Sequence, residues 1–213
     1  MKPVLTSLLA AAAFVSTQAA ASVTYTNGDS GVRVASFGDS PRYAAASFGE
    51  VIHAWVPTTL EAFSFWIADG DAGGYSFGIA AWDGVQTSGG NLYAAQGTYA
   101  GGAQELRFSG IDTPLAAGSY IVYVTVAGQL HPIVNSDLEL GSNAGAVGGG
   151  FYFEDLHGGL DPLVPGDWDG VEDSADLEYS ATFSSSVAEP APLALLLGGL
   201  GLAAALSRRR RAG

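Results

Sequence analysis

Residues 119–127 read SYIVYVTVA, and this stretch decides the fold class. Successive side chains of a strand point to opposite faces of a sheet. The residues at positions 120, 122, 124 and 126 are aromatic or aliphatic and share one face, while Ile121, Tyr123 and Thr125 share the other. Both faces are therefore apolar, and the stretch predicts a central strand that is buried on both sides.

The chain on either side of this stretch is also typical of β structure. It is rich in Gly, Ser, Thr and aromatic residues, and no long segment repeats apolar residues at the spacing of a helix. Short runs bounded by turn residues predict eight strands. These are Val51–Val56, Leu60–Ile67, Tyr75–Trp82, Leu92–Tyr99, Glu105–Phe108, Tyr120–Ala127, Gly150–Phe153 and Leu177–Phe183.

Glycine-rich turns join these runs, which favours an antiparallel arrangement. We expect residues 22–183 to form an all-β, antiparallel β-sandwich of the jelly-roll type. The segment PLAAGSYIVYV, residues 114–124, is similar to a turn and strand common in noncatalytic jelly-roll modules of secreted bacterial proteins.

The body of the chain is strongly acidic. Between residues 22 and 188 it holds twenty Asp and Glu residues but only three basic ones, Arg33, Arg42 and Arg107, which gives a formal charge of −17. Such a surface repels phosphate backbones, so nucleic acid is excluded as a partner. The chain has no cysteine, which excludes disulfides and thiolate chemistry. The acidity fits either solubility outside the cell or the binding of divalent cations.

The N-terminus has the features of a secretory signal peptide. Residues 1–21 contain one basic residue, Lys2, followed by the apolar run LLAAAAFV and by small residues that end in Ala19-Ala20-Ala21. This order matches an A-x-A cleavage site, and the apolar run is too short to span a bilayer. We expect a signal helix over residues 1–21 that is removed on export, leaving a chain that begins at Ser22.

The C-terminus combines a spacer, an apolar segment and a basic end. Residues 184–190 form a polar linker, residues 191–207 a single predicted transmembrane helix, and residues 208–213 a basic tail. As a helix, the uncharged residues 191–206 would reach about 24 Å, against a hydrocarbon core of about 30 Å. Clustered positive charge stays cytoplasmic, so the body is expected to face outward. The residues that set this topology are Arg208, Arg209, Arg210 and Arg211.

This order of parts resembles the PEP-CTERM sorting signal of Gram-negative bacteria. In that family the core motif reads Val-Pro-Glu-Pro; the matching residues here are Val187, Ala188, Glu189 and Pro190, so alanine replaces the first proline. The resemblance implies an exosortase as partner and a transient stay in the inner membrane. It also implies cleavage near the Glu-Pro step and delivery to the cell surface or to an extracellular polysaccharide matrix. An ordinary C-terminal membrane anchor would share the apolar segment and the arginines, and it stays open as an alternative.

The densest acidic cluster lies in the segment DPLVPGDWDGVEDSADLEY, residues 161–179. Calcium prefers several oxygen ligands at flexible distances, and closely spaced carboxylates supply them, although the EF-hand pattern is absent. Trp168 within the segment is expected to pack under the last strand. The alternative to a calcium site is a solvated acidic loop. The candidate calcium ligands are Asp167, Asp169, Glu172, Asp173 and Asp176.

Motifs for catalysis are weak. The segment GYSFG, residues 74–78, satisfies G-x-S-x-G, but a strand-like run follows Ser76 where a nucleophile elbow requires a helix. The three histidines, His53, His131 and His157, lack the spacing of zinc sites. We therefore expect a noncatalytic body with a structural or adhesive role.

Two other functions stay open for the body. The tryptophans could stack on sugar rings, although tryptophans on sandwich strands commonly belong to the core. A flat strip of exposed aromatic residues would therefore indicate a carbohydrate-binding module. A cleft with two facing carboxylates would indicate a surface glycoside hydrolase. The tryptophans are Trp55, Trp66, Trp82 and Trp168.

Overall fold

The computed structural model of the 213-residue chain describes six stretches of the body. They are residues 21–37, 45–142, 148–155, 162–163, 168–171 and 175–185. The expected signal helix, the sorting motif at Val187–Pro190, the expected transmembrane helix and the four arginines lie outside these residues. No helix within the described stretches is long and apolar enough to cross a membrane.

The described residues form twelve strands and no helix, which confirms the all-β prediction. All neighbouring strands pair antiparallel except β2 and β3, which meet in parallel where Phe37 pairs with Ala45. The strands are β1 (Ser22–Thr26), β2 (Asp29–Phe37), β3 (Ala45–Ala54), β4 (Thr58–Asp71), β5 (Gly73–Trp82), β6 (Thr87–Tyr99), β7 (Gln104–Leu115), β8 (Gly118–Thr125), β9 (Val134–Gly141), β10 (Gly148–Asp155), β11 (Trp168–Val171) and β12 (Tyr179–Ser184).

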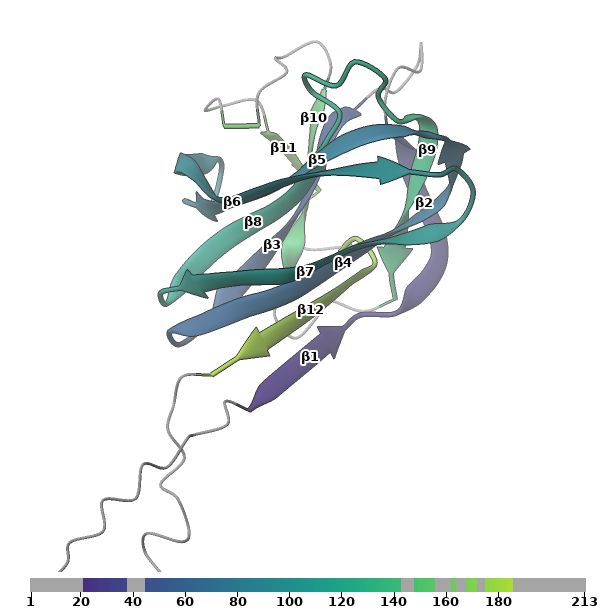
Figure 1. The fold of residues 1–213 in the computed structure, drawn as a ribbon. Coiled ribbons are helices and arrows are strands. Elements are labelled where there is room, and N and C mark those ends of the chain that lie inside the picture. The colour runs from purple at the N-terminus through teal and green to yellow at the C-terminus, as the bar shows by residue number, and fades with distance from the viewer. Residues whose placement is uncertain are drawn as a thin grey trace, which may run out of the picture. The chain divides into compact units, whose positions relative to one another are not determined.

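The strands lie in two layers that enclose the main core (Figure 1). One layer contains β1, β12, β4 and β7, and the other contains β10, β3, β8, β5 and β6, while β9 and β2 connect them. Phe77 of β5 stacks on Phe108 of β7 with ring centroids 3.8 Å apart, and it contacts Phe63 of β4 at 6.4 Å. These contacts between the layers confirm the antiparallel β-sandwich.

Strand β8 is buried on both faces, as residues 119–127 predicted. It lies between β3 and β5, where Val124 pairs with Phe48 on one side and Phe77 on the other. Val122 and Val124 face the main core. Ile121 and Tyr123 belong to a second apolar cluster, on the opposite face of β8.

The second cluster covers the outer face of β5 and β8. Trp168 of β11 is 6% exposed, and its ring meets Trp82 at 6.1 Å and Tyr123 at 6.0 Å, edge to face in both cases. Its indole N–H donates to the Pro162 carbonyl at 3.0 Å. The expected burial of Trp168 is confirmed. Its expected place under the last strand is wrong, because β11 pairs with β10 and brings the ring over β5 and β8 instead.

Four of the twelve strands were not predicted, namely β1, β2, β9 and β11. Strand β1 is exposed along most of its length, and β9 alternates buried residues with acidic ones, so neither contains an apolar run. Strand β11 has four residues and lies within the acidic segment. Strand β3 begins at Ala45 rather than Val51, because the glycine and glutamate at positions 49 and 50 interrupt its apolar pattern.

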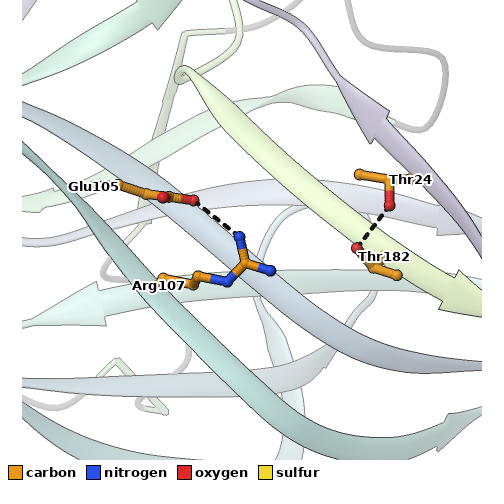
Figure 2. A network of polar contacts seen from close by, with 4 residues as sticks. All are labelled: Thr24, Glu105, Arg107 and Thr182. Carbon is orange, nitrogen blue, oxygen red and sulfur yellow. Dashed lines mark hydrogen bonds and ion pairs between the residues drawn. The ribbon is translucent and has the colours of Figure 1, made fainter.

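The first and last strands lie side by side (Figure 1). Their register runs from Ser22 opposite Ser184 to Thr26 opposite Ser180. The hydroxyls of Thr24 and Thr182 share a hydrogen bond of 2.9 Å across the pair (Figure 2). The main-chain N–H of residue 185 also donates to the carbonyl of residue 21. The two ends of the body therefore leave the sheet at the same place.

Candidate functional site

A carboxylate lies inside the main core. Glu50 is 0% exposed and shares the inward face of β3 with Phe48 and Ile52. The main-chain N–H of Leu177 donates to its Oε2 at 3.0 Å, but its Oε1 has no hydrogen-bond partner. Burying a charged group without a full set of partners is costly, so such a residue commonly has a function.

A second carboxylate faces Glu50. Asp176 is 4% exposed and directly precedes Leu177, whose N–H binds Glu50. Gly148, the first residue of β10, borders both groups. A Cβ built on Gly148 would lie 2.9 Å from Asp176 Oδ2 and 3.0 Å from Glu50 Oε1. The two oxygens therefore border one small space that the missing side chain of Gly148 leaves open.

The electrostatics of the pair follow from this geometry. Burial, and next the negative charge of Asp176, raises the pKa of Glu50 well above its usual value. The two carboxyl groups are also placed to share a proton, which raises this pKa further. The hydrogen bond from Leu177 lowers the pKa but does not offset these effects. No basic side chain among the described residues contributes to the pKa of Glu50. The pair therefore favours a bound proton or a bound cation.

The chain around Asp176 is held from several sides. The Asn27 side chain donates from Nδ2 to the Leu177 carbonyl at 2.6 Å and accepts at Oδ1 from the Tyr179 N–H at 2.9 Å. The carbonyl of Asp176 accepts from the N–H of Gly141 at 2.9 Å. These hydrogen bonds fix the segment that carries Asp176 against β9 and against the turn between β1 and β2.

A second acidic cluster lies beside this segment. Ligand oxygens of Asp29, Glu139 and Glu178 all lie within 4.8 Å of one another. Burial, followed by the charges of Asp29 and Glu139, raises the pKa of Glu178 to about 7. Burial and Asp29 also raise the pKa of Glu139. Asp29 is exposed and the two glutamates are half-buried, so the cluster is open to solvent.

The predicted calcium ligands do not form one described group. Asp169 is exposed on β11, whereas Asp176 is buried beside Glu50. Asp167, Glu172 and Asp173 lie outside the described residues. The sequence thus identified one member of the buried pair. It missed Glu50, and the only signal in the sequence was an acidic residue inside an otherwise apolar run.

Two of the other candidate residues, Ser76 and His53, form side-chain hydrogen bonds within the sandwich. Ser76 lies within β5 rather than before a helix, and its Oγ accepts from Gln129 Nε2 at 2.8 Å. His53 Nδ1 shares a hydrogen bond of 2.9 Å with the Ser119 hydroxyl. His131 borders a groove described below, and His157 lies outside the described residues.

The tryptophans divide between core and surface. Trp82 and Trp168 are buried in the second cluster, Trp66 is half-buried, and Trp55 is 77% exposed. The described residues therefore show no flat strip of exposed tryptophans. Trp55 lies in the turn between β3 and β4, with its ring 5.6 Å from that of His53.

Two adjoining grooves lie along β5, β6 and β8. The larger has a volume of about 910 Å³ and the smaller about 570 Å³, and both are lined by Gln96 and Gly128. Polar groups of the larger groove come from Ser76, Asn91, Gln96 and Thr125. None of the described lining residues of either groove is acidic, so the described walls supply no carboxylate pair for hydrolysis.

Hydrogen bonds from two buried side chains hold one wall of the larger groove in place. Pro162 and Leu163 form part of this wall. The carbonyl of Pro162 accepts hydrogen bonds from the Trp168 indole and from the Thr87 hydroxyl at 3.2 Å. The Tyr123 hydroxyl donates to Asn91 Oδ1 at 2.7 Å on the groove surface. Trp168 and Tyr123 of the second apolar cluster thus position the Pro162 carbonyl and the Asn91 side chain at the groove.

Comparisons with known proteins identify no family for this chain. No protein-family model matches the chain, and no curated protein matches it in sequence. The sandwich is similar to a crystal structure of the cysteine protease and lectin-like domains of Cwp84, a surface layer associated protein of Clostridium difficile. The TM-score is 0.44 and the sequence identity 14% over 66% of this chain, which spans about a third (33%) of the length of that structure.

Proposed function

We propose that this chain is an exported, noncatalytic protein that acts at the cell surface or in an extracellular polysaccharide matrix, where its jelly-roll-like body adheres by binding neutral glycan. The observation that carries the proposal is the pair of adjoining grooves on β5, β6 and β8. Their polar side chains are amides and hydroxyls, together with the His131 imidazole in the smaller groove, and none of the described lining residues is acidic. Sugar hydroxyls need such neutral donors and acceptors, set in a partly apolar surface.

The boundaries of the fold support export and processing. Strand β1 begins at Ser22, directly after the expected cleavage site of the signal peptide. Strand β12 ends at Ser184, where the predicted linker begins. Removal of residues 1–21 and of the chain beyond Glu189 would leave every described strand intact. We therefore propose sorting by an exosortase, with a transient stay in the inner membrane.

Glycan binding is tested with a glycan array, followed by calorimetry of the wild-type protein and of Gln96→Ala on the best glycan. Gln96 is exposed and lines both grooves, so its truncation should weaken binding about tenfold without changing the melting temperature. Trp55→Ala is the matched control, because Trp55 is exposed but lines neither groove. A loss of binding in Trp55→Ala alone, or no binding to any glycan, would reject the grooves as the site.

Sorting is tested by intact-mass analysis of the protein recovered from the cell surface. The expected mass lacks residues 1–21 and everything beyond the Glu189-Pro190 region. A recovered chain that still carries Arg208–Arg211 would rule out processing and favour the ordinary membrane anchor.

A further inference from the structure

We propose that Glu50 and Asp176 bind a hard divalent cation, of which calcium is the best fit, in the space beside Gly148. The cation would join the inward face of β3 to the segment that leads into β12. This site differs from the acidic segment that the sequence indicated, because its first ligand is a core residue of a central strand.

The unpartnered oxygen of Glu50 is the first observation that points to a ligand. Glu50 is fully buried, and its Oε1 has no hydrogen-bond partner although its Oε2 accepts from Leu177. A folded protein rarely leaves a buried carboxylate oxygen without a donor, an ion pair or a metal. This oxygen borders the same space as Asp176 Oδ2.

Three basic side chains that the structure describes lie away from Glu50. Arg107 is 63% exposed and forms an ion pair of 3.7 Å with Glu105 on β7 (Figure 2). Arg33 lies opposite Glu139 in the register of β2 and β9, and it lowers the pKa of Glu139. His53, three residues after Glu50 on β3, points to the opposite face and binds Ser119. Within the described residues, none of these three side chains is thus placed to balance the charge of Glu50.

The chemistry of the two ligands selects the kind of cation. Both donors are carboxylate oxygens, which hard cations such as calcium prefer, and the chain has no thiolate to offer a softer metal. Calcium also accepts main-chain carbonyls and water as further ligands. Gly148 keeps the space open, because any side chain there would meet both oxygens at about 3 Å.

The test measures calcium binding by calorimetry and thermal unfolding with the full chain in detergent, in EDTA and in calcium. Wild-type protein should bind calcium, and at a hundred times the Kd its Tm should rise by about 5–10 °C. Glu50→Gln should stay folded in EDTA, because the amide has nearly the same shape and no charge to bury, but it should lose the calcium response. Gly148→Ala should fold and bind at least about tenfold more weakly.

Two controls separate this site from the other acidic groups. Asp169→Asn alters the segment indicated by the sequence, and Glu178→Gln alters the cluster of Asp29, Glu139 and Glu178. Both variants should respond to calcium as the wild type does. The proposal fails if wild-type Tm is the same in EDTA and calcium, since the pair then shares a proton instead. It also fails if Glu50→Gln and Gly148→Ala retain wild-type affinity, or if only a control variant loses binding.

Discussion

At the scale of single residues, the side-chain amide of Asn27 binds the segment that leads into β12 through both its nitrogen and its oxygen. The residue is 4% exposed, and it binds the carbonyl of Leu177 and the N–H of Tyr179. We expect Asn27→Ala to lower the free energy of unfolding by about 2–4 kcal/mol, because two buried main-chain groups lose their partners. Chemical denaturation followed by tryptophan fluorescence measures this change.

Thr24→Ala is the matched control for Asn27→Ala. It removes a hydrogen bond to Thr182 that also joins distant parts of the chain, but at an exposed position (Figure 2). Its expected cost is under about 1 kcal/mol. Equal losses in the two variants would show that Asn27 does not fix the segment.

Single residues also show which features of the fold can be predicted from the sequence and which cannot. The alternation of residues 119–127 predicted a strand buried on both faces, because every position in it is apolar or small enough to bury. Glu50 carried no comparable signal. A charged residue in a strand ordinarily points to solvent, and only the pairing of β10 with β3 and the hydrogen bond from Leu177 show that this one points inward.

At the scale of elements, β2, β9 and the residue directly before β12 bring three carboxylates together, those of Asp29, Glu139 and Glu178. The pKa of Glu178 is raised to about 7, and that of Glu139 is also raised. A carboxyl group with a raised pKa binds its proton more tightly in the folded state. The stability it contributes is complete below its unfolded pKa of about 4.3 and is lost as pH rises through about 7.

We therefore expect the free energy of unfolding, measured in EDTA, to fall between about pH 5 and pH 8. Glu139→Gln should make this fall smaller, because Glu139 is one of the charges that raise the pKa of Glu178. Glu105→Gln, on β7, serves as the control and should retain the wild-type pH profile. A profile that is flat in the wild type, or unchanged in Glu139→Gln, would contradict repulsion within the cluster.

The elements that were missed share a physical cause. Strands β1 and β9 have few buried apolar side chains of their own, so they form by pairing with β12, β2 and β4 rather than by local preference. The predicted strands carry apolar side chains at successive or alternate positions, and each of them contributes to the main core. The grooves were not predictable for the same reason, since residues 76, 96 and 125 meet only through the pairing of β5 with β6 and β8.

At the scale of the whole molecule, the two ends of the body meet in one sheet. Strand β1 pairs with β12, and the hydrogen bond between Thr24 and Thr182 spans 158 positions of the chain. The buried partners Glu50 and Leu177 are 127 positions apart. Contacts this distant in sequence form late and slowly in folding. An exported chain with this topology would remain open until its last strand has crossed the membrane.

Two fragments test this dependence on the last strand. The fragment 21–186 keeps every described strand and should unfold in one cooperative transition, with no effect of reductant because the chain has no cysteine. The fragment 21–174 lacks Asp176, Leu177 and β12, so β1 loses its partner and the core loses Tyr179 and Phe183. It should show no cooperative transition by circular dichroism. A cooperative transition in the shorter fragment would mean that the sandwich closes without its final strand, and that export and folding need not be coupled in this order.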